Sequence, residues 1–598
     1  METNKSEITA VHASAEDVHT PEATSHGLET KHEIDVIGGF EADIDTLPPG
    51  YFRSRFFIGT FFAIGFSLVA GVGAFGYAAP ILGIINADIG PDPRYTWISL
   101  VYNAALAVCI APLGRITDIF GRRWWFIGSG VVSVVGSIVC ATANDIPTLI
   151  GGNVLLGVGT AAQLSFHYVL GEIVPMKYRY YAGAAIYVFS IAGSGIGPLI
   201  PYSFIQYHPQ VGWRGVYWVL LAINVLALVC WALFYFPPSF DKKHRADVHN
   251  SKAYWIKNFD YVGTFLFAAG FVLFLMGLSW GGVVYPWNHP APICGIVIGF
   301  AVMVLFVLWE IYAPIKEPLV PMHLFKNIEW TVSVVLLSLG ASVYYGFAIV
   351  WPAQCATLWN TGDLIYLGLI SSIIGLAIIA GQIVGGIACK RIGHTRIQVM
   401  VVFTLGAIFL GATAAAQPDT FKMAVALVVV GLFFTGWNES VCLANTTICV
   451  TDQQLVGTAG GLAGSLRSGI CAIIVAIYVT VLTNRMGETI PAQVPPALVD
   501  AGLPASSVAD FIVAIGGGGA LDAIPGITDK IIEIGTAAYK QASADAYRTV
   551  YLSTLAFSGI AIILTYWAPN TTKYMTDNIA ATLHREDVSD NEKVVSDN

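Results

Sequence analysis

The sequence Gly114-Arg-Ile-Thr-Asp118-Ile-Phe-Gly121-Arg122-Arg123 joins two long apolar segments, and it decides the fold of this 598-residue chain. Its glycines permit a tight turn and a close approach of helices. Asp118 can cap a helix N-terminus or pair with Arg122 or Arg123. A loop of this composition between two membrane spans predicts a latch that holds one side of the protein in a single conformational state.

The segments on either side of this loop, and most of the chain beyond them, are apolar. Apolar residues make up 55% of the sequence and charged residues 12%, about half the charged share of a soluble globular protein. Apolar stretches of about twenty residues recur from about Phe56 to Pro569, and each can cross a hydrocarbon core of roughly 30 Å as a helix. We therefore predict an all-α polytopic membrane protein with fourteen transmembrane helices. Their predicted centres lie near residues 68, 105, 133, 158, 190, 224, 271, 303, 341, 377, 407, 432, 470 and 558.

The charged residues predict how the chain is oriented. Residues 1–48 hold eleven acidic residues against Lys5 and Lys31, which accounts for the net charge of −9, and their composition predicts a disordered acidic tail over residues 1–55. This leader has no apolar run, so we expect no cleavable signal peptide. Fifteen lysines and arginines follow helices 2, 4, 6, 8 and 10, against about three on the other side. This asymmetry predicts that both tails are cytoplasmic.

A second copy of the opening loop indicates that the chain is built from two halves. The sequence from Gly386 to Arg396 repeats the seven-residue separation of the glycines, with Lys390 where the first copy has Asp118. Carriers built from such repeats bind substrate at the interface of the halves. We predict two six-helix bundles with helices 7 and 8 inserted between them. The predicted boundaries are 1–55 for the tail, 56–237 for the first bundle, 238–329 for the linker and inserted pair, 330–568 for the second bundle and 569–598 for the second tail.

The outer connection between helices 13 and 14, residues 485–547, is unusually long. It contains prolines, a glycine run and an amphipathic stretch from Asp529 to Tyr547. We expect a partly helical cap over the outer opening, and a substrate trap, a packing lid and a simple connector all remain open. The nine cysteines lie in or beside apolar segments without a CxxC pair, which predicts buried thiols and neither disulfides nor a metal site.

The loop 114–123 resembles the signature loop of the major facilitator superfamily, and the fourteen-helix plan resembles its branch with many drug exporters. Helix 5 carries Gly193-Ser-Gly-Ile-Gly197-Pro198, which is similar to the motif that this superfamily associates with antiporters. Helix 4 departs from the family pattern, because Asn153 stands where an arginine is common. The proton-coupling role of that arginine therefore cannot be transferred to this chain.

Four further phrases resemble the fungal trichothecene efflux pump family. They are Leu47-Pro-Pro-Gly-Tyr51, Glu172-Ile-Val-Pro-Met-Lys-Tyr-Arg179, Gly212-Trp-Arg-Gly-Val-Tyr-Trp218 and Gly277-Leu-Ser-Trp-Gly-Gly282. The resemblance implies a fungal pump that expels trichothecene mycotoxins by proton antiport and protects the producing cell. It also implies a monomer in the plasma membrane, with a vacuolar or vesicle membrane as the alternative. Importers of ferric siderophores share the fourteen-helix plan and are the alternative function.

Two charges inside spans are candidates for the transport site. A charge at a helix centre costs about 2.5–3.5 kcal/mol on insertion scales and needs a partner or a watery cavity. Glu439 of helix 12 and Arg467 of helix 13 lie at similar depth on consecutive antiparallel helices, so an ion pair is geometrically plausible. Glu439 is either a proton-exchanging carboxylate or one partner of a structural salt bridge, and the sequence leaves both open.

Polar stripes on helices 12 and 4 accompany these charges. The first stripe holds Thr435, Asn438, Glu439, Cys442 and Thr446, and the second holds Asn153, Thr160, Gln163 and His167. Because helices 12 and 4 are related by the repeat, we predict that both stripes line the central cavity, with polar packing between helices as the alternative. His167 either titrates or packs. Trp437 either stacks on an apolar ligand or faces lipid.

The sequence offers no ATP-binding or catalytic motif. It contains no P-loop, no HExxH and no nucleophile elbow, and it lacks a clustered constellation of His or carboxylate residues. We therefore expect a carrier for a small molecule, driven by the proton gradient, rather than an enzyme. We expect no cofactor, no metal and no nucleic-acid partner.

Overall fold

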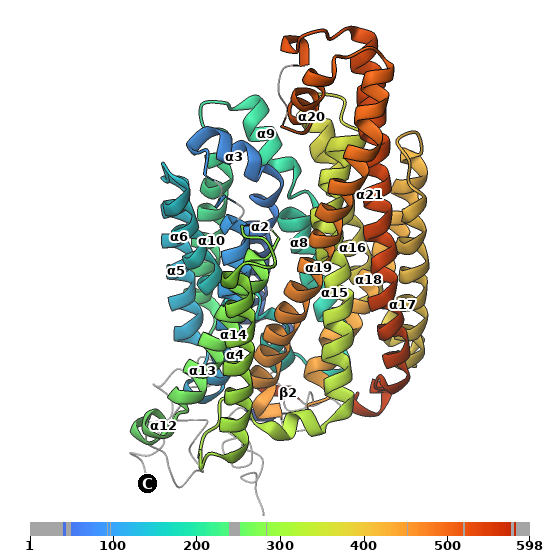
Figure 1. Ribbon diagram of the computed structural model, residues 1–598. Helices are drawn as coiled ribbons and strands as arrows, with labels where there is room; N and C mark the ends of the chain where they lie inside the picture. Colours follow the sequence, from blue (N-terminus) through green and yellow to red (C-terminus); the bar gives the residue numbers. More distant parts are fainter. Residues whose placement is uncertain are drawn as a thin grey trace, which may run out of the picture.

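The computed structural model describes residues 40–42, 50–92, 94–95, 97–237, 252–282, 284–450, 453–517, 521–575 and 579–581. Most of the predicted tails, 1–55 and 569–598, lies outside these ranges, and their predicted disorder is not tested. The described residues form a bundle of long helices with one pair of short strands (Figure 1).

The described residues hold thirteen helices that are long and apolar enough to span a membrane, and fourteen if one bent pair is a single span. The bent pair, Met176–Gly195 and Leu199–Tyr207, meets at 41°. Every predicted centre falls inside one of these fourteen spans. The prediction of an all-α polytopic membrane protein is confirmed.

The first half begins with α2 (Arg55–Gly76), which starts where Ser54 accepts a hydrogen bond from the Phe57 backbone at 3.1 Å. Its other helices are α3 (Leu82–Ile89), α4 (Trp97–Phe120), α5 (Arg123–Ala141), α6 (Ile146–Gln163), α7 (Phe166–Ile173), α8 (Arg179–Ser190), α9 (Leu199–Tyr207) and α10 (Gly215–Phe234). Short turns are η2 (Tyr51–Arg53), η3 (Ala79–Ile81), η4 (Met176–Tyr178), the π-helix η5 (Ile191–Gly195) and η6 (Gly212–Arg214).

The inserted pair is α13 (Tyr261–Trp280) and α14 (Pro290–Tyr312), preceded by α12 (Lys252–Asn258). The second half contains α15 (Ile328–Leu358), α16 (Leu364–Ile392), α17 (Thr395–Ala412), α18 (Phe421–Ile448), α19 (Val456–Asp500), α20 (Val508–Gly517) and α21 (Asp529–Leu564). Its turns are η7 (Met322–Lys326), η8 (Thr413–Ala415), η9 (Gln453–Leu455), η10 (Ala505–Ser507), η11 (Leu521–Ala523), η12 (Thr565–Trp567) and η13 (Thr571–Tyr574). Strands β1 (Phe40–Ala42) and β2 (Ile579–Ala581) pair antiparallel.

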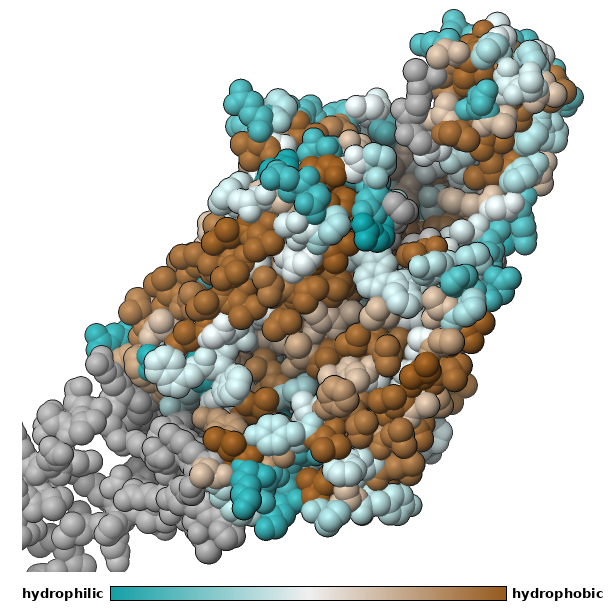
Figure 2. All heavy atoms as spheres, turned by 60° about the vertical axis from the view of Figure 1, so that its left-hand side comes forward, coloured by the Kyte–Doolittle hydropathy of each residue, from teal (hydrophilic) through white to brown (hydrophobic). Residues whose placement is uncertain are grey.

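The bundle has two polar ends and an apolar flank. Figure 1 places α12 and β2 at one end, which we call the tail face, and α3, α9 and α20 at the other, which we call the cap face. Figure 2 shows apolar residues covering the flank and hydrophilic residues gathered toward the ends. The inserted helix α14 buries only 17% of its most apolar window inside the protein. Such a flank fits a hydrocarbon environment, because apolar side chains exposed there are not in contact with water.

The segment 485–547 is largely helical. Helix α19 continues to Asp500 although three prolines lie in it, and α21 begins at Asp529. Their extensions pack with α20 around Leu498, Phe511 and Ile531. This small apolar cluster stabilises a raised cap at the top of Figure 1. The predicted domain boundaries themselves stay a prediction.

Candidate functional site

A central cavity lies between the two halves. Its walls come from α2, α4, α7 and α8 of the first half and from α15, α16, α18 and α19 of the second. It encloses about 1380 Å³ of space, counted with its opening to solvent. The lining extends to Pro80, Pro198 and Pro352, near the cap-face ends of their helices. The walls are mainly aliphatic and aromatic, so the few charged residues in them define the polar chemistry of the site.

Glu439 and Arg467 form an ion pair in the wall of this cavity. Arg467 donates a hydrogen bond from Nη2 to Glu439 Oε1. The Gln382 amide donates to the other carboxylate oxygen, Oε2, at 3.0 Å. The Glu439 side chain is 7% exposed and that of Arg467 20% exposed. The two residues come from α18 and α19 of the same half, so the pair does not bridge the halves. The expected ion pair is therefore present and faces the cavity.

Glu439 does not use all the hydrogen-bond donors of the Arg467 guanidinium. Its carbon lies 5.5 Å from the centre of the Tyr345 ring, and its Nε is buried without a hydrogen-bond partner among the described residues. An arginine carries five donors in a fixed planar arrangement. Because Nε is enclosed, the cavity reaches Arg467 through the rest of its side chain, which is 20% exposed.

His167 also lines the cavity, although its helix differs from the one we predicted. Its Nε2 lies 3.2 Å from the Gly460 carbonyl oxygen of α19, and its Nδ1 is buried without a partner in the described structure. A ring nitrogen facing a carbonyl must carry the proton, which leaves Nδ1 as an acceptor in the neutral ring. His167 therefore contacts both halves at the inner end of the cavity.

Of the predicted stripe on helix 4, only His167 lines the cavity, and Asn153, Thr160 and Gln163 do not. Asn153 donates to the Leu149 carbonyl at 2.9 Å, and Gln163 donates to Asn224 at 2.6 Å and to Ser133 at 3.2 Å. Both amides thus pack among α5, α6 and α10. The count of 100° per residue places Asn153, Thr160 and Gln163 on one face of α6, but that face packs against α5 and α10. His167 lies beyond the break between α6 and α7, so it reaches the cavity while the residues of α6 do not.

The stripe on helix 12 is divided in the same way. Glu439 faces the cavity, whereas the Asn438 amide approaches the Leu336 carbonyl of α15 at 3.5 Å. Trp437 donates to Gln398 of α17 at 3.3 Å and packs against Gly385 of α16. Neither Asn438 nor Trp437 lines the central cavity. Trp437 packs between α16 and α17, so the structure shows neither of the two alternatives for it, ligand stacking or facing lipid.

The loop 114–123 closes the tail face by contacting the second half. Asp118 accepts from the Thr458 backbone at 2.5 Å and from the Thr458 hydroxyl at 2.7 Å. Thr458 lies in the first turn of α19, so a carboxylate from α4 caps a helix of the other half and interacts favourably with its dipole. Gly114 permits this approach, because a Cβ there would lie 2.3 Å from the Gly457 carbonyl oxygen.

The two arginines of the loop have different roles. Arg122 is buried and pairs with Asp118 at 2.9 Å and with Glu172 of α7. Arg123 instead donates to the Ala232 carbonyl of α10 at 2.9 Å. Gly121, with φ 87°, makes the turn that separates them. Of the two pairings expected for Asp118, the structure has the one with Arg122.

The second copy of the loop also reaches across the halves. Lys390 lies with its ammonium 4.3 Å from the centre of the Tyr178 ring and 5.2 Å from that of Tyr181. Arg179 strengthens the same seam, because its guanidinium donates to the Thr447 carbonyl at 2.9 Å and to Gln453 at 2.8 Å. The tail face is thus closed by polar contacts while the cavity extends toward the cap face.

The helix-5 motif forms a break in its span. Residues Ile191–Gly195 are π-helical, and a turn containing Gly197 and Pro198 leads into α9. Gly193 permits close packing, since a Cβ there would lie 2.4 Å from a Val72 methyl group of α2. The break places Ser194 and Pro198 in the cavity wall.

The comparisons with known proteins agree with this architecture. The family model described as "Fungal trichothecene efflux pump (TRI12)" matches residues 37–598. The chain belongs to this family. It is 28% identical over 544 residues to "Trichothecene efflux pump TRI12" of Fusarium sporotrichioides and 28% identical over 549 residues to the protein of the same name of Trichoderma arundinaceum, covering 90% of each chain in both cases.

Two further similarities place the pump in the wider superfamily. It is 28% identical to "MFS-type transporter prx5" of Penicillium rubens, over 80% of this chain and 85% of the relative. The solved structure of the human organic anion transporter MFSD10 matches with a TM-score of 0.51 at 12% identity, covering 87% of this chain and all of that one. The latter supports the fold. Together these findings identify the pump as a multi-pass efflux transporter of the major facilitator superfamily that moves a small molecule.

Sequence reasoning missed several cavity residues of the pump. Gln382 holds Glu439 in place, and Tyr187, Tyr344 and Tyr345 line the walls. A signal existed for Gln382, since it is an isolated amide in the apolar span of α16. The tyrosines lie away from helix ends, where aromatic residues usually mark the membrane interface. Their mid-span positions were therefore informative.

Proposed function

We propose that the pump exports amphipathic small molecules of the trichothecene class by proton-coupled alternating access. The observation that carries this proposal is a titratable carboxylate, Glu439, paired with Arg467 in the wall of a largely apolar cavity between two halves. A carboxylate that alternates between pairing with arginine and binding a proton can couple the proton gradient to a change of state. Glu439 is then the proton-carrying residue.

The chemistry of the cavity supports a sesquiterpenoid substrate. Apolar rings pack against the aliphatic and aromatic walls, and substrate oxygens accept from Arg467 or from the hydroxyls of Tyr187 and Tyr344. Two relatives that cover 90% of this chain are named as trichothecene efflux pumps. A single ion pair among the described residues of a mostly apolar lining favours a neutral, oxygenated ligand over a multiply charged one.

The proposal includes an orientation and a membrane. The tail face carries the basic loops, so it is cytoplasmic, with both tails on that side. The closed tail face and the cavity that extends toward the cap face then correspond to an outward-directed state. Export from the cell requires the plasma membrane, with a vacuolar or vesicle membrane as the alternative. The pump acts as a monomer.

Transport into sealed inside-out vesicles tests this function. With a pH gradient that is acid inside, we expect accumulation of labelled trichothecene, and a protonophore abolishes it. Accumulation that persists without the gradient, or that follows ATP alone, contradicts the proposal. Uptake of a labelled ferric siderophore into intact cells, with no trichothecene export, would favour the alternative of a siderophore importer.

Cells provide a second test of the direction. Deletion of the pump should increase intracellular toxin and sensitivity to it, and a protonophore should reproduce the increase in toxin in wild-type cells. If deletion lowered intracellular toxin, the direction of transport would be inward. Growth rescue on ferric siderophore by the intact pump would indicate the same.

A further inference from the structure

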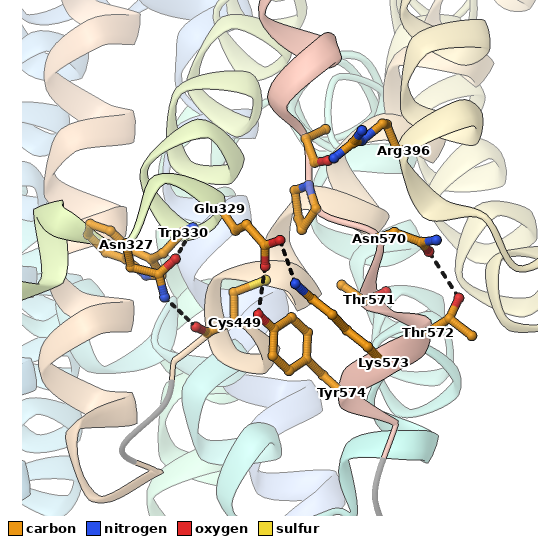
Figure 3. A network of polar contacts seen from close by, with 12 residues as sticks. Asn327, Glu329, Trp330, Arg396, Cys449, Asn570, Thr571, Thr572, Lys573 and Tyr574 are labelled. Carbon is orange, nitrogen blue, oxygen red and sulfur yellow. Dashed lines mark hydrogen bonds and ion pairs between the residues drawn. The ribbon is translucent and has the colours of Figure 1, made fainter. Parts of the chain in front are cut away.

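The C-terminal segment after the last span crosses the tail face and contacts the opposite half. Residues 568–574 leave α21 of the second half, and Figure 3 shows them beneath the start of α15. Their backbone is held by α17: the Thr395 hydroxyl donates to the Pro569 carbonyl at 2.9 Å, and Arg396 donates to the Ala568 carbonyl at 2.8 Å. We call residues 568–574 the strap.

A second attachment joins the strap to α15. Lys573 and Tyr574 each contact one carboxylate oxygen of Glu329 at 2.7 Å (Figure 3). The Lys573 side chain is 57% exposed, so this pair contributes little on its own. It fixes the strap at a defined position below the second half.

One hydroxyl of the first half completes the network. Tyr180 of α8 donates to Asn445 Oδ1 of α18 at 2.6 Å, and its oxygen lies 2.8 Å from the Thr571 hydroxyl. Since the single phenol proton goes to Asn445, the Tyr180 oxygen is the acceptor toward Thr571. The Thr571 hydroxyl also lies 3.2 Å from the Thr395 hydroxyl of α17, and its one proton is shared between these two oxygens. Tyr180, Asn445 and Thr571 are at most 1% exposed. These buried bonds join the strap and α18 to the first half.

The strand pair provides an independent link of the same kind. Strand β2 follows the strap, lies against α7, and pairs with β1, in the register Phe40↔Ala581 and Ala42↔Ile579. Strand β1 precedes α2 in the chain. The segment that continues from the second half is therefore attached to the first half at two places.

We propose that Tyr180 and the strap position the two halves in the transport cycle by fastening the tail face closed. Opening of this face separates α8 from α18 and the strap, so both hydrogen bonds of the Tyr180 hydroxyl must break. The strap consequently shifts the equilibrium between the two access states toward the one with a closed tail face. This inference rests on alternating access, but it makes no assumption about substrate or proton.

Two native cysteines report on this equilibrium at different depths. Cys449 is 1% exposed, and Tyr574 of the strap packs against the apolar cluster that contains it. Cys442 is also 1% exposed and lies on α18, about two helical turns farther in. Loosening of the strap alone exposes Cys449, whereas separation of the halves exposes Cys442 as well.

The test measures maleimide labelling of both cysteines from the tail face, resolved by mass spectrometry, in the full-length pump in membranes. Tyr180→Phe and Thr571→Val each remove one hydroxyl and keep the shape of the side chain. Thr571→Val removes the hydrogen bond to Tyr180, together with a contact to Thr395 inside the second half, and loss of the one bond between the halves is expected to raise the labelling rate of both cysteines about five-fold. Tyr180→Phe removes both hydrogen bonds of its hydroxyl, so a larger increase is expected.

Matched controls exist in the same molecule. Among the described residues, Tyr202→Phe removes a hydroxyl that bonds to Pro80 in its own half, and Thr572→Val removes one that bonds to Asn570 within the strap. Both controls are expected to label like the wild type. Equal labelling in Tyr180→Phe and Tyr202→Phe would overturn the proposal, as would faster labelling of Cys449 without Cys442. If Tyr180→Phe does not fold, Thr571→Val against Thr572→Val decides the question alone. Because labelling needs no substrate, it can succeed even if trichothecene transport fails.

Discussion

Arg122 and Arg467 are both arginines paired with carboxylates inside the helical bundle, yet their surroundings differ. Arg122 is sealed at the tail face between Asp118 and Glu172, with its side chain 4% exposed. Arg467 pairs with Glu439 in the cavity wall, with its side chain 20% exposed and one nitrogen unused among the described residues. The Asp118 cluster bonds to the opposite half, and the Glu439 pair does not.

This difference separates two roles for similar chemistry. A sealed pair whose carboxylate also bonds to the opposite half, as Asp118 does to Thr458, has those bonds made in one access state and broken in the other, so it changes the populations of those states. A pair within one half is not pulled apart by the movement of the halves, so it is free to exchange a proton or contact substrate. The following predictions test this division, from the largest expected effect to the smallest.

The largest effect is expected for Glu439→Gln. The amide keeps the shape and hydrogen bonding of the side chain but cannot ionise, so gradient-driven transport is abolished while substrate binding is retained. Transport in vesicles and binding by the purified protein measure the two properties separately.

The double variant Glu439→Gln, Arg467→Gln is the control for a purely structural pair. Removal of one partner of a buried pair costs about 3–5 kcal/mol at worst, and removal of both should restore protein abundance. We expect abundance to recover without proton-driven transport. Full recovery of proton-driven transport would exclude Glu439 as the essential proton site.

A smaller effect is expected for Asp118→Asn. The substitution removes the charge that caps α19 and pairs with Arg122, while Glu172 still compensates the arginine. We expect insertion to be preserved and the transport rate at matched abundance to fall about ten-fold, which corresponds to about 1.4 kcal/mol. Asp145→Asn is the matched control, because Asp145 caps α6 within one half and asparagine caps equally well. Unchanged turnover in Asp118→Asn would mean that the loop is only a turn.

A still smaller effect is expected for Gln382→Leu. This change removes the donor to Glu439 Oε2 and keeps a similar volume, so the cost is that of one hydrogen bond, about 1 kcal/mol. The carboxylate is then held less firmly, and the transport rate at matched abundance should fall about five-fold. A transport rate that matches the wild type would show that Gln382 does not position Glu439.

The smallest effect is expected for Lys390→Met, at the second copy of the loop. A cation over exposed tyrosine rings contributes about 0.5–1 kcal/mol, so transport should change by no more than about five-fold. The control is Lys422→Met, because Lys422 lies at the start of α18, away from the loop that contains Lys390. An effect as large as that of Asp118→Asn would show that both copies act as equal latches.

The sequence contained the pattern of spans and the repeat of the loop, because hydropathy and glycine spacing are local properties. The fourteen spans and the pairing of Glu439 with Arg467 could be predicted, since a charge at mid-span requires a partner and consecutive helices limit the choice. Of the two predicted stripes, Glu439 and His167 line the cavity, whereas Asn153, Gln163 and Asn438 do not. Counting 100° per residue shows which residues share one face of a helix, but it does not show whether that face contacts the cavity or another helix.

Only the tertiary structure decided which helices meet between the halves. That Asp118 caps α19, that Lys390 lies over Tyr178 and that Thr571 reaches Tyr180 depends on how residues hundreds of positions apart are brought together. The break between α6 and α7 turns His167 into the cavity. Such contacts are set by close packing of rigid helices, where a glycine such as Gly114 fixes the distance between two backbones. The sequence therefore determined the membrane fold and its buried charges, and packing determined which of them cross the halves.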